Sequence, residues 1–273
     1  CIRDRSTAVG NEVDPSNKLI WFDNNYYSNT NTNPNSLSNW HTGTNGTGLN
    51  PSNFTTATDN FVVQNGDTYT ANADWSISGD LQVESGGELV TGANTVSIDL
   101  VSDIDGTLTV SNSGTYDCNG LSDIDGTVSI ATGTYDADGE FNANSGNVTF
   151  TAAGNLNLSN TVTDLGTFTK STGTVTYDEA DAQTVDNVDY HHLVISGGAT
   201  KSLSNTTNVG GDLTVTAAST VLAVGSNTID VNGTTAISSS GTVTVSTGTF
   251  DADGTMNCSA NFTFTDAGAL NLS

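Results

Sequence analysis

The sequence predicts an all-β chain that folds as a parallel β-helix (β-solenoid) of about nine or ten short coils with an irregular N-terminal cap region. Three observations support this prediction. Apolar residues alternate with small polar ones over short stretches, a unit of about 20 residues occurs twice in succession, and no segment shows helical spacing. A unit of this length cannot bury its own apolar face, so it must stack on a neighbour, as a solenoid coil does.

Short strands are predicted where Val, Ile, Leu or Phe recurs at every second position. A single Ser, Thr or Asn separates the apolar residues, and Gly, Asn or Asp bounds the stretches, which is the pattern of strands joined by tight turns. Ala, Leu, Lys and Glu never cluster at helical spacing, so no helix is predicted. The clearest of these stretches are 128–130, 148–150, 156–158, 213–215, 243–245 and 262–264.

The repeated unit distinguishes the solenoid from other all-β folds. Residues 103–120 and 123–139 both begin with Asp-Ile-Asp-Gly-Thr, so that Asp103 recurs as Asp123 and Tyr116 recurs as Tyr135. A near-identical duplication would leave one strand unpaired in an immunoglobulin-type sandwich, and a propeller blade takes about 40 residues, twice this spacing. Stacked coils therefore predict Asp103 beside Asp123 and Tyr116 beside Tyr135.

A longer period is superposed on the short one. The spacing between matching segments is larger for early segments of the body than for later ones, and the difference is about one coil. The first copy therefore contains one extra coil. We predict a solenoid body at 71–273 made of two imperfect copies, about 75–205 and an incomplete 206–273. The matching pairs are 79–83 with 211–215, 126–139 with 241–254, and 148–159 with 262–273.

Residues 1–70 differ from the body in composition. All three prolines and two of the three tryptophans, Trp21 and Trp40, lie in this stretch. The terminal coils of a solenoid expose apolar faces and unpaired strand edges unless something covers them. We therefore predict that residues 1–70 form a head that caps the N-terminal end.

The C-terminal end has no such cap in its sequence. Residues 255–273 end on Asn-Leu-Ser, the counterpart of the segment ending at Ser159, where the first copy continues directly into further strands. We expect these residues to bury apolar side chains against something outside this sequence. Cys118 and Cys258 align with or near alanines of equivalent coils, so both are expected in the interior as small hydrophobes.

The charge balance excludes several classes of partner. Five Lys+Arg stand against 30 Asp+Glu, a formal net charge of −25. Nucleic-acid binding depends on clustered Lys and Arg, and docking on an anionic membrane surface needs basic residues too, so neither is predicted. No apolar run reaches the length of about 18 residues that a membrane span needs, so none is predicted.

Repeated Asp-x-Asp-Gly motifs are the clearest chemical feature. Oxygen-only ligands followed by a glycine turn are typical of Ca²⁺ loops, and stacked coils would bring carboxylates to about 5 Å from one another. The favoured interpretation is that the motifs form the tight corners of the coil, because 232–240 offers Asp251 and Asp253 no acidic partner. The alternative is a calcium site, and no cofactor is predicted to be required. The predicted ligands are Asp103, Asp105, Asp123, Asp125, Asp136 and Asp138.

Paired carboxylates also occur in glycoside hydrolases, but no enzyme activity is predicted here. The only lysines of the body, Lys170 and Lys201, lie outside the acidic motifs, and the aspartate pairs repeat along the rod whereas a catalytic site is used once. The alternative function is a carbohydrate-binding or carbohydrate-cleaving β-helix of tailspike or pectinase type. Exposed Trp and Tyr side chains, on which sugars stack, would favour that alternative.

Several segments resemble repetitive secreted surface proteins of gliding and marine bacteria, and the resemblance covers most of residues 18–273. In that group such segments form parallel β-helices within adhesins or extracellular filaments. The resemblance implies a structural or adhesive protein, extracellular or on a bacterial cell surface, that assembles head to tail. Its implied partners are copies of itself or the rest of a larger repeat protein, with a surface glycan or receptor as a further class. The segments are Lys18-Leu-Ile-Trp-Phe22, Leu37-Ser-Asn-Trp40, Asp59-Asn-Phe-Val-Val63, 79–81, 190–203 and 210–215.

Overall fold

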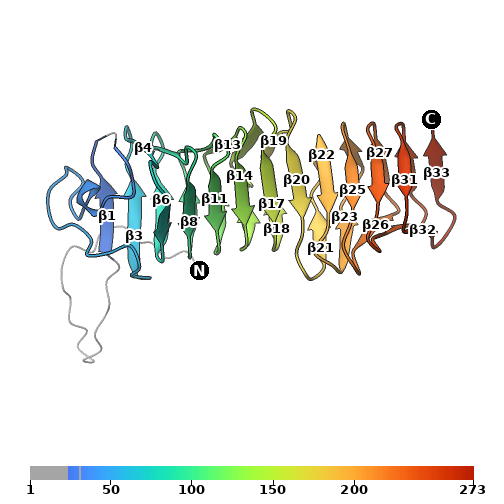
Figure 1. The fold of residues 1–273 in the computed structure, drawn as a ribbon, viewed down its shortest axis with the longest axis horizontal. Helices are drawn as coiled ribbons and strands as arrows, with labels where there is room; N and C mark the ends of the chain where they lie inside the picture. The colour runs from blue at the N-terminus through green and yellow to red at the C-terminus, as the bar shows by residue number, and fades with distance from the viewer. Residues whose placement is uncertain (1–23, 31) are drawn as a thin grey trace, which may run out of the picture.

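The computed structural model describes residues 24–30 and 32–273, which form an elongated all-β rod (Figure 1). The rod is a parallel β-solenoid of about 11 turns, so the predicted fold class is confirmed. Ten of these turns contribute to one ten-stranded sheet that begins at β5 (Trp75–Ile77) and ends at β31 (Met256–Cys258). In the described part of the chain the only helix is the short 3₁₀ turn η1 (Leu37–Asn39).

Five sheets, which we call A to E, form the walls of the rod. Sheet A contains β1 (Asn24–Ser28), β2 (Trp40–His41), β3 (Asp59–Val63), β6 (Asp80–Val83), β9 (Ser102–Ile104), β12 (Ser122–Ile124), β15 (Phe141–Asn142) and β18 (Val162–Asp164). Sheet B contains β4 (Thr68–Thr70), β7 (Glu88–Val90), β10 (Thr107–Val110), β13 (Thr127–Ile130), β16 (Asn147–Phe150) and β19 (Thr167–Thr169).

Sheet C runs along most of the rod, and sheets D and E belong to its C-terminal part. Sheet C contains β5, β8 (Thr95–Ile98), β11 (Thr115–Cys118), β14 (Thr134–Ala137), β17 (Asn155–Leu158), β20 (Thr174–Tyr177), β22 (His192–Ile195), β25 (Leu213–Val215), β28 (Thr235–Ile237) and β31. Sheet D contains β21 (Gln183–Val185), β23 (Thr200–Leu203), β26 (Val221–Gly225), β29 (Thr242–Val245) and β32 (Asn261–Phe264). Sheet E contains β24 (Thr207–Val209), β27 (Thr228–Val231), β30 (Thr249–Ala252) and β33 (Ala269–Leu272).

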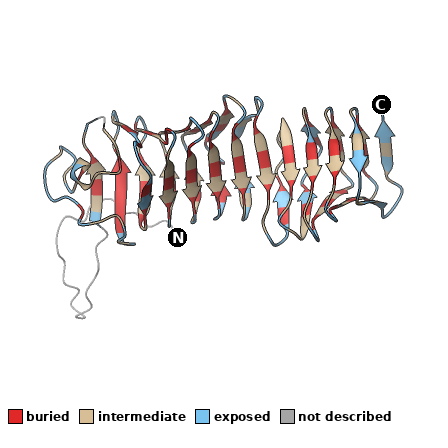
Figure 2. Ribbon diagram, in the orientation of Figure 1, coloured by how far each residue is buried: buried red, intermediate tan, exposed pale blue. Residues whose placement is uncertain are grey.

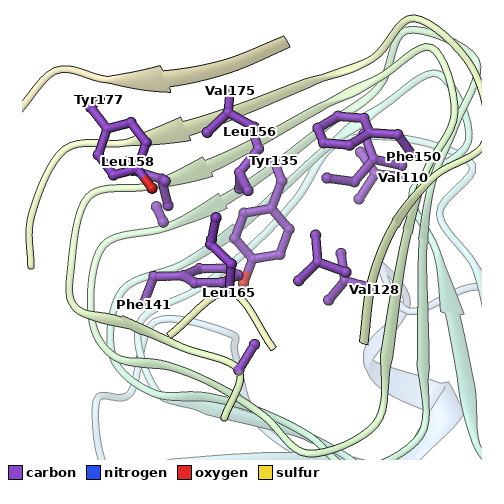
Figure 3. Close-up of a cluster of buried hydrophobic side chains, with 14 of the residues drawn as sticks. Val110, Val128, Tyr135, Phe141, Phe150, Leu156, Leu158, Leu165, Val175 and Tyr177 are labelled. Carbon is purple, nitrogen blue, oxygen red and sulfur yellow. The ribbon is translucent and has the colours of Figure 1, made fainter. Parts of the chain in front are cut away.

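The predicted alternation of residue types builds the interior. In β10, Leu108 and Val110 are fully buried while Thr107 and Thr109 face outward, and most strands repeat this pattern. Apolar side chains from neighbouring sheets meet along the axis of the rod, as Figure 3 shows for one section of it, and Figure 2 marks the buried positions along the strands. Burying one such side chain stabilises the fold by about 1.5–3 kcal/mol, so a continuous stacked core holds coils that would not fold singly.

The two tyrosines of the duplicated unit lie in this interior. Tyr116 and Tyr135 are register partners in β11 and β14, and their ring centroids are 5.0 Å apart. Each hydroxyl forms a hydrogen bond with a buried serine, Ser102 for Tyr116 and Ser122 for Tyr135. The buried polar groups are therefore satisfied, and the predicted pairing of the two rings is confirmed.

Aromatic side chains cover the N-terminal end of the solenoid. Strand β1 pairs in parallel with β3 and antiparallel with β2, so the regular parallel order stops there. Trp40 is fully buried and stacks on Trp75, the first residue of sheet C, with 5.5 Å between ring centroids. Phe54 also packs against the ring of Trp75, edge to face. The described part of the predicted head thus covers the first coil, whereas Trp21 lies outside the described residues.

The second sequence copy is turned about the rod axis relative to the first. Sheet D begins with β21 beside β18 of sheet A, and Tyr190, which bridges to Val209 of sheet E, lies with its ring centroid 6.0 Å from that of Phe168 in sheet B. Walls D and E therefore continue walls A and B. By sequence, β13 of sheet B matches β29 of sheet D, and β14 of sheet C matches β30 of sheet E. Because the chain runs from wall A through B to C, each repeated strand lies one wall earlier along this path than its counterpart in the first copy.

Candidate functional site

Four of the six predicted ligands gather at one corner of the rod. Asp103 and Asp123 are register partners on the outer face of sheet A, in β9 and β12. Asp105 and Asp125 follow these strands at the turn into sheet B, where their N–H groups donate to the carbonyls of Val83 (2.9 Å) and Ile104 (3.1 Å). These four aspartates form what we call the sheet A carboxylate cluster.

Burial and mutual repulsion change the acidity of this cluster. Partial burial, followed by the charges of Asp105, Asp123, Asp125 and Asp80, raises the pKa of Asp103 to about 6. Burial and the neighbouring carboxylates raise the pKa of Asp123 as well. A carboxylate that is partly desolvated beside others of the same charge binds a proton more readily, so part of the repulsion is relieved at mildly acidic pH.

Two amide side chains bracket the cluster along the rod. The Gln82 Nε2 group donates to Asp103 Oδ2 at 3.2 Å, and the Asn142 Nδ2 group donates to Asp123 Oδ1 at 3.4 Å. Gln82 and Asn142 occupy the coils immediately before and after the pair, at the same position of sheet A. The carboxylates thus receive donors at both ends of the stack but face one another in the middle.

The other two predicted ligands lie elsewhere. Asp136 is on the outer face of sheet C in β14, where its register partner is Asp117 of β11, and Asp138 lies at the turn that follows β14. Burial and then the Asp138 charge raise the pKa of Asp136, while a hydrogen bond from the Asn157 side chain opposes this. The structure therefore divides the six predicted residues between the sheet A carboxylate cluster and a separate pair.

A further acidic pair lies on sheet E. Asp251 of β30 has an acidic register partner after all, Asp230 of β27, which lies one coil earlier. The expectation that Asp251 lacks an acidic partner is wrong, because its register partner is residue 230, which lies just before the stretch 232–240. The pKa of Asp230 is raised by burial and by Asp253 and Asp251, and its Oδ1 atom has no hydrogen-bond partner.

The side-chain arrangement does not by itself define a metal centre. Within residues 24–30 and 32–273, no group of three or more His, Cys, Asp or Glu side chains is placed so that it could hold a metal ion. Oxygen-only donors from Asp103, Asp123 and their neighbours suit Ca²⁺ better than softer metals. Calcium binding at the sheet A carboxylate cluster therefore stays a prediction that needs an experiment.

A buried lysine is the most unusual charged group of the described chain. The Lys201 side chain is fully buried, and its Nζ donates to the backbone carbonyls of Asp181 (2.9 Å), Gly198 (2.8 Å) and Glu179. Burial lowers the pKa of Lys201. The ammonium thereby fixes the loop between β20 and β21, where the change from walls A and B to walls D and E takes place.

The last coil exposes apolar side chains that the preceding coils bury. Phe264 of β32 is 43% exposed and Leu272 of β33 is 64% exposed, whereas their counterparts one repeat earlier, Phe150 and Leu158, are each 1% exposed. Strands β31, β32 and β33 are the last members of sheets C, D and E, so their outer edges are unpaired in this chain. Figure 2 shows the loss of buried positions along β33.

The cysteines follow the same division between interior and last coil. Cys118 is buried in β11, as expected for a small interior hydrophobe. Cys258 is exposed, so its predicted burial is wrong in this chain. It lies in β31, at the uncovered edge of sheet C, where no further coil packs against it.

Aromatic side chains that could stack on a sugar are scarce on the described surface. Trp40 and Trp75 are buried, and every described tyrosine is buried except Tyr27, which is half-buried. In the described ranges the exposed large apolar residues are Leu49, Leu100, Phe264 and Leu272. Only one of these, Phe264, has a ring, and it belongs to the last coil.

Comparisons with protein-family models, with curated proteins and with solved structures found no match to this chain. Among the residues that the structure describes, none belongs to a helix with the length and apolar character needed to cross a membrane.

Proposed function

We propose that this chain is a structural or adhesive rod, extracellular or on a bacterial cell surface, that is extended end to end. The extension joins it either to further copies in a filament or to further coils of a larger repeat adhesin. One observation carries the proposal, namely the elongated parallel β-solenoid of about 11 turns, whose apolar core is continuous from coil to coil. The location outside the cell rests on the resemblance of the sequence to secreted bacterial surface proteins.

The counterpart of the last coil within the same chain supports extension. Strand β17 is equivalent to β33, and it pairs along its whole length with β20 of the next coil. Strand β16 is equivalent to β32 and pairs with β19. An uncovered solenoid end leaves backbone donors and acceptors free to pair with another chain, and apolar side chains available for burial.

The surface composition favours a rod over the carbohydrate-directed alternative. Sugar-binding grooves use exposed Trp and Tyr, whereas the tryptophans and nearly all tyrosines of the described chain are buried in the core. The acidic pairs recur along the rod, as Asp103/Asp123, Asp117/Asp136 and Asp230/Asp251. A feature that repeats with the coil belongs to the architecture of the rod.

Self-association tests this proposal. The net charge of −25 opposes contact between copies, so assembly should require salt or divalent cations. We expect light scattering and electron microscopy of the full chain to detect end-to-end oligomers in NaCl or CaCl₂ that dissociate at low ionic strength. A monodisperse monomer at high concentration in both salts would count against a filament of copies. If the native material instead contains longer rods formed by one continuous polypeptide, that result would support the repeat-adhesin form.

A further inference from the structure

We infer that the outer face of sheet B binds the surface of ice, because its polar side chains form a regular lattice on which water can order as it does in the crystal. This activity goes beyond the structural or adhesive role proposed above and does not depend on it. The outward-facing side chains of β10, β13, β16 and β19 form what we call the hydroxyl array. They are Thr107, Thr109, Thr127, Ser129, Asn147, Thr149, Thr167 and Thr169.

The hydroxyl array is regular in two dimensions. Parallel pairing places the first outward residue of each strand in one row along the rod and the second in another, with no shift of register from β10 to β19. Neighbours within a row are about 4.8 Å apart, the spacing between strands, and the two rows are about 6.6–6.8 Å apart, the length of two strand residues. Both spacings are close to the repeat distances of the oxygen atoms on a prism face of hexagonal ice.

The side chains of the hydroxyl array are free to bind water. Among them, only Thr109 has a side-chain hydrogen bond within the described chain, which its hydroxyl donates to Glu88 Oε1 at 3.2 Å. Outward side chains of sheets A and C bond to one another instead, as Gln82 does to Asp103. Threonine also has few rotamers because it branches at Cβ, so fixing its hydroxyl on a crystal surface costs little entropy.

The hydroxyl array also lacks charge, although the chain carries a net −25. Sheets A, C and E each present paired aspartates on their outer faces. On the strands of sheet B the only charged residue is Glu88 of β7, at the border of the array. Ionised groups hold their own hydration water strongly, and this water does not fit the neutral lattice of ice. The uncharged wall of an acidic rod is therefore the one suited to an ice surface.

Sheet D shows a similar face that is interrupted. Its strands β29 and β32 are the sequence counterparts of β13 and β16, and they also point threonines outward. The strand before them, β26, instead presents Val221 and Ala223, and its register with β29 shifts between Ala223 and Gly225. Four successive coils of regular polar positions thus occur on sheet B but not on sheet D. We therefore expect only the hydroxyl array of sheet B to hold an ice surface.

A crystalline polysaccharide is the other extended surface that a flat polar face could meet. Sugars stack on exposed aromatic rings, and the hydroxyl array contains no aromatic side chain. Its regular hydroxyls without an aromatic platform favour ice over a polysaccharide.

Partition of the full chain into growing ice tests the inference. A dilute solution is frozen slowly on a cooled probe, and the protein concentration in the ice is compared with that in the remaining liquid. Thr149→Tyr places a bulky ring in the middle of the hydroxyl array, and Thr244→Tyr, on the interrupted face of sheet D, is the matched control. We expect wild type and the control to enter the ice, and Thr149→Tyr to lower the ice-to-liquid ratio at least tenfold.

Both substitutions lie at outward positions, and coincident thermal melts of the three chains check that the fold is unchanged. Should Thr149→Tyr fail to fold, Thr169→Glu, which adds a charge at an exposed position of the array, should lower the ratio in the same way. Exclusion of wild type from the ice, or equal ratios for Thr149→Tyr and Thr244→Tyr, would overturn the inference. Wild-type binding to microcrystalline cellulose together with exclusion from ice would assign the face to a polysaccharide instead.

Discussion

Asp103 and Asp123 lie directly opposite one another on adjacent parallel strands, with the amide of Gln82 on one side of the pair and that of Asn142 on the other. Both carboxylates point outward from sheet A, and no basic side chain of the described residues forms an ion pair with either. The pair is thus a place where the regular spacing of the solenoid, about 4.8 Å between strands, holds like charges together.

The pair makes stability depend on pH. An aspartate in an unfolded chain has a pKa of about 3.9, whereas that of Asp103 is raised to about 6 in the fold. The folded state therefore binds more protons between these values, and its stability falls as the pH rises from about 4 to about 6. We expect Asp103→Asn to raise the Tm at pH 7 and to flatten this decrease. Asp99→Asn, at an exposed turn residue, is the control, and an identical pH profile for the Asp103 variant and wild type would contradict the prediction.

Calcium should oppose the same repulsion if it binds at the cluster. We expect a chelator to lower the Tm of the full chain and CaCl₂ to restore it, because a bound cation offsets the charges of Asp103 and Asp123. Asp105→Asn combined with Asp125→Asn should abolish this dependence. NaCl at matched ionic strength separates binding from screening, since screening alone would let sodium replace calcium. Melting curves that coincide with and without the chelator would rule the site out.

The buried lysine should be a structural requirement. Lys201→Met leaves the carbonyls of Glu179, Asp181 and Gly198 without their common donor, so we expect the free energy of unfolding to fall by about 1–3 kcal/mol or more. Lys170→Met is the matched control, because Lys170 is partly exposed and its ion pair with Asp189 spans 3.9 Å. That change should alter stability by less than about 1 kcal/mol in urea titrations. Comparable losses in the two variants would show that Lys201 does not hold the loop.

The tight corner at Gly139 should reject any side chain. A Cβ atom at this position would lie 1.9 Å from the carbonyl oxygen of Gly120 in the preceding coil, and the backbone there cannot withdraw without separating the coils. We expect Gly139→Ala to destabilise the chain by about 1–3 kcal/mol or more. Gly210→Ala is the control, since its nearest atoms would lie at 3.4 Å and beyond. Thermal melts of the two variants that shift equally would contradict this account of the corner.

The sequence located the sheet A carboxylate cluster because its two motifs are nearly identical and adjacent. The alignment of the two motifs placed Asp103 against Asp123, and the register confirms that pairing. The stretch 232–240 gave no sign of the pair Asp230/Asp251, because Asp230 lies just before that stretch, one coil earlier than Asp251. The role of Lys201 could not be predicted from the sequence either. Its hydrogen-bond partners are backbone carbonyls, whose positions do not depend on which residues carry them.

The sequence by itself determined which side chains point inward, because alternation with a period of two assigns each strand residue to the core or to solvent. It also determined that the coils stack in parallel, because equivalent residues recur at about one coil length. Only the tertiary structure decided on which wall each strand lies. One passage between walls is the loop between β20 and β21, where the Lys201 ammonium donates to the carbonyls of Glu179 and Asp181. The coil there, from Thr174 to its register partner His192, is the shortest between neighbouring strands of sheet C. Corner geometry of this kind is set by contacts between coils, so the rotation of the second copy could not be derived from its residues alone.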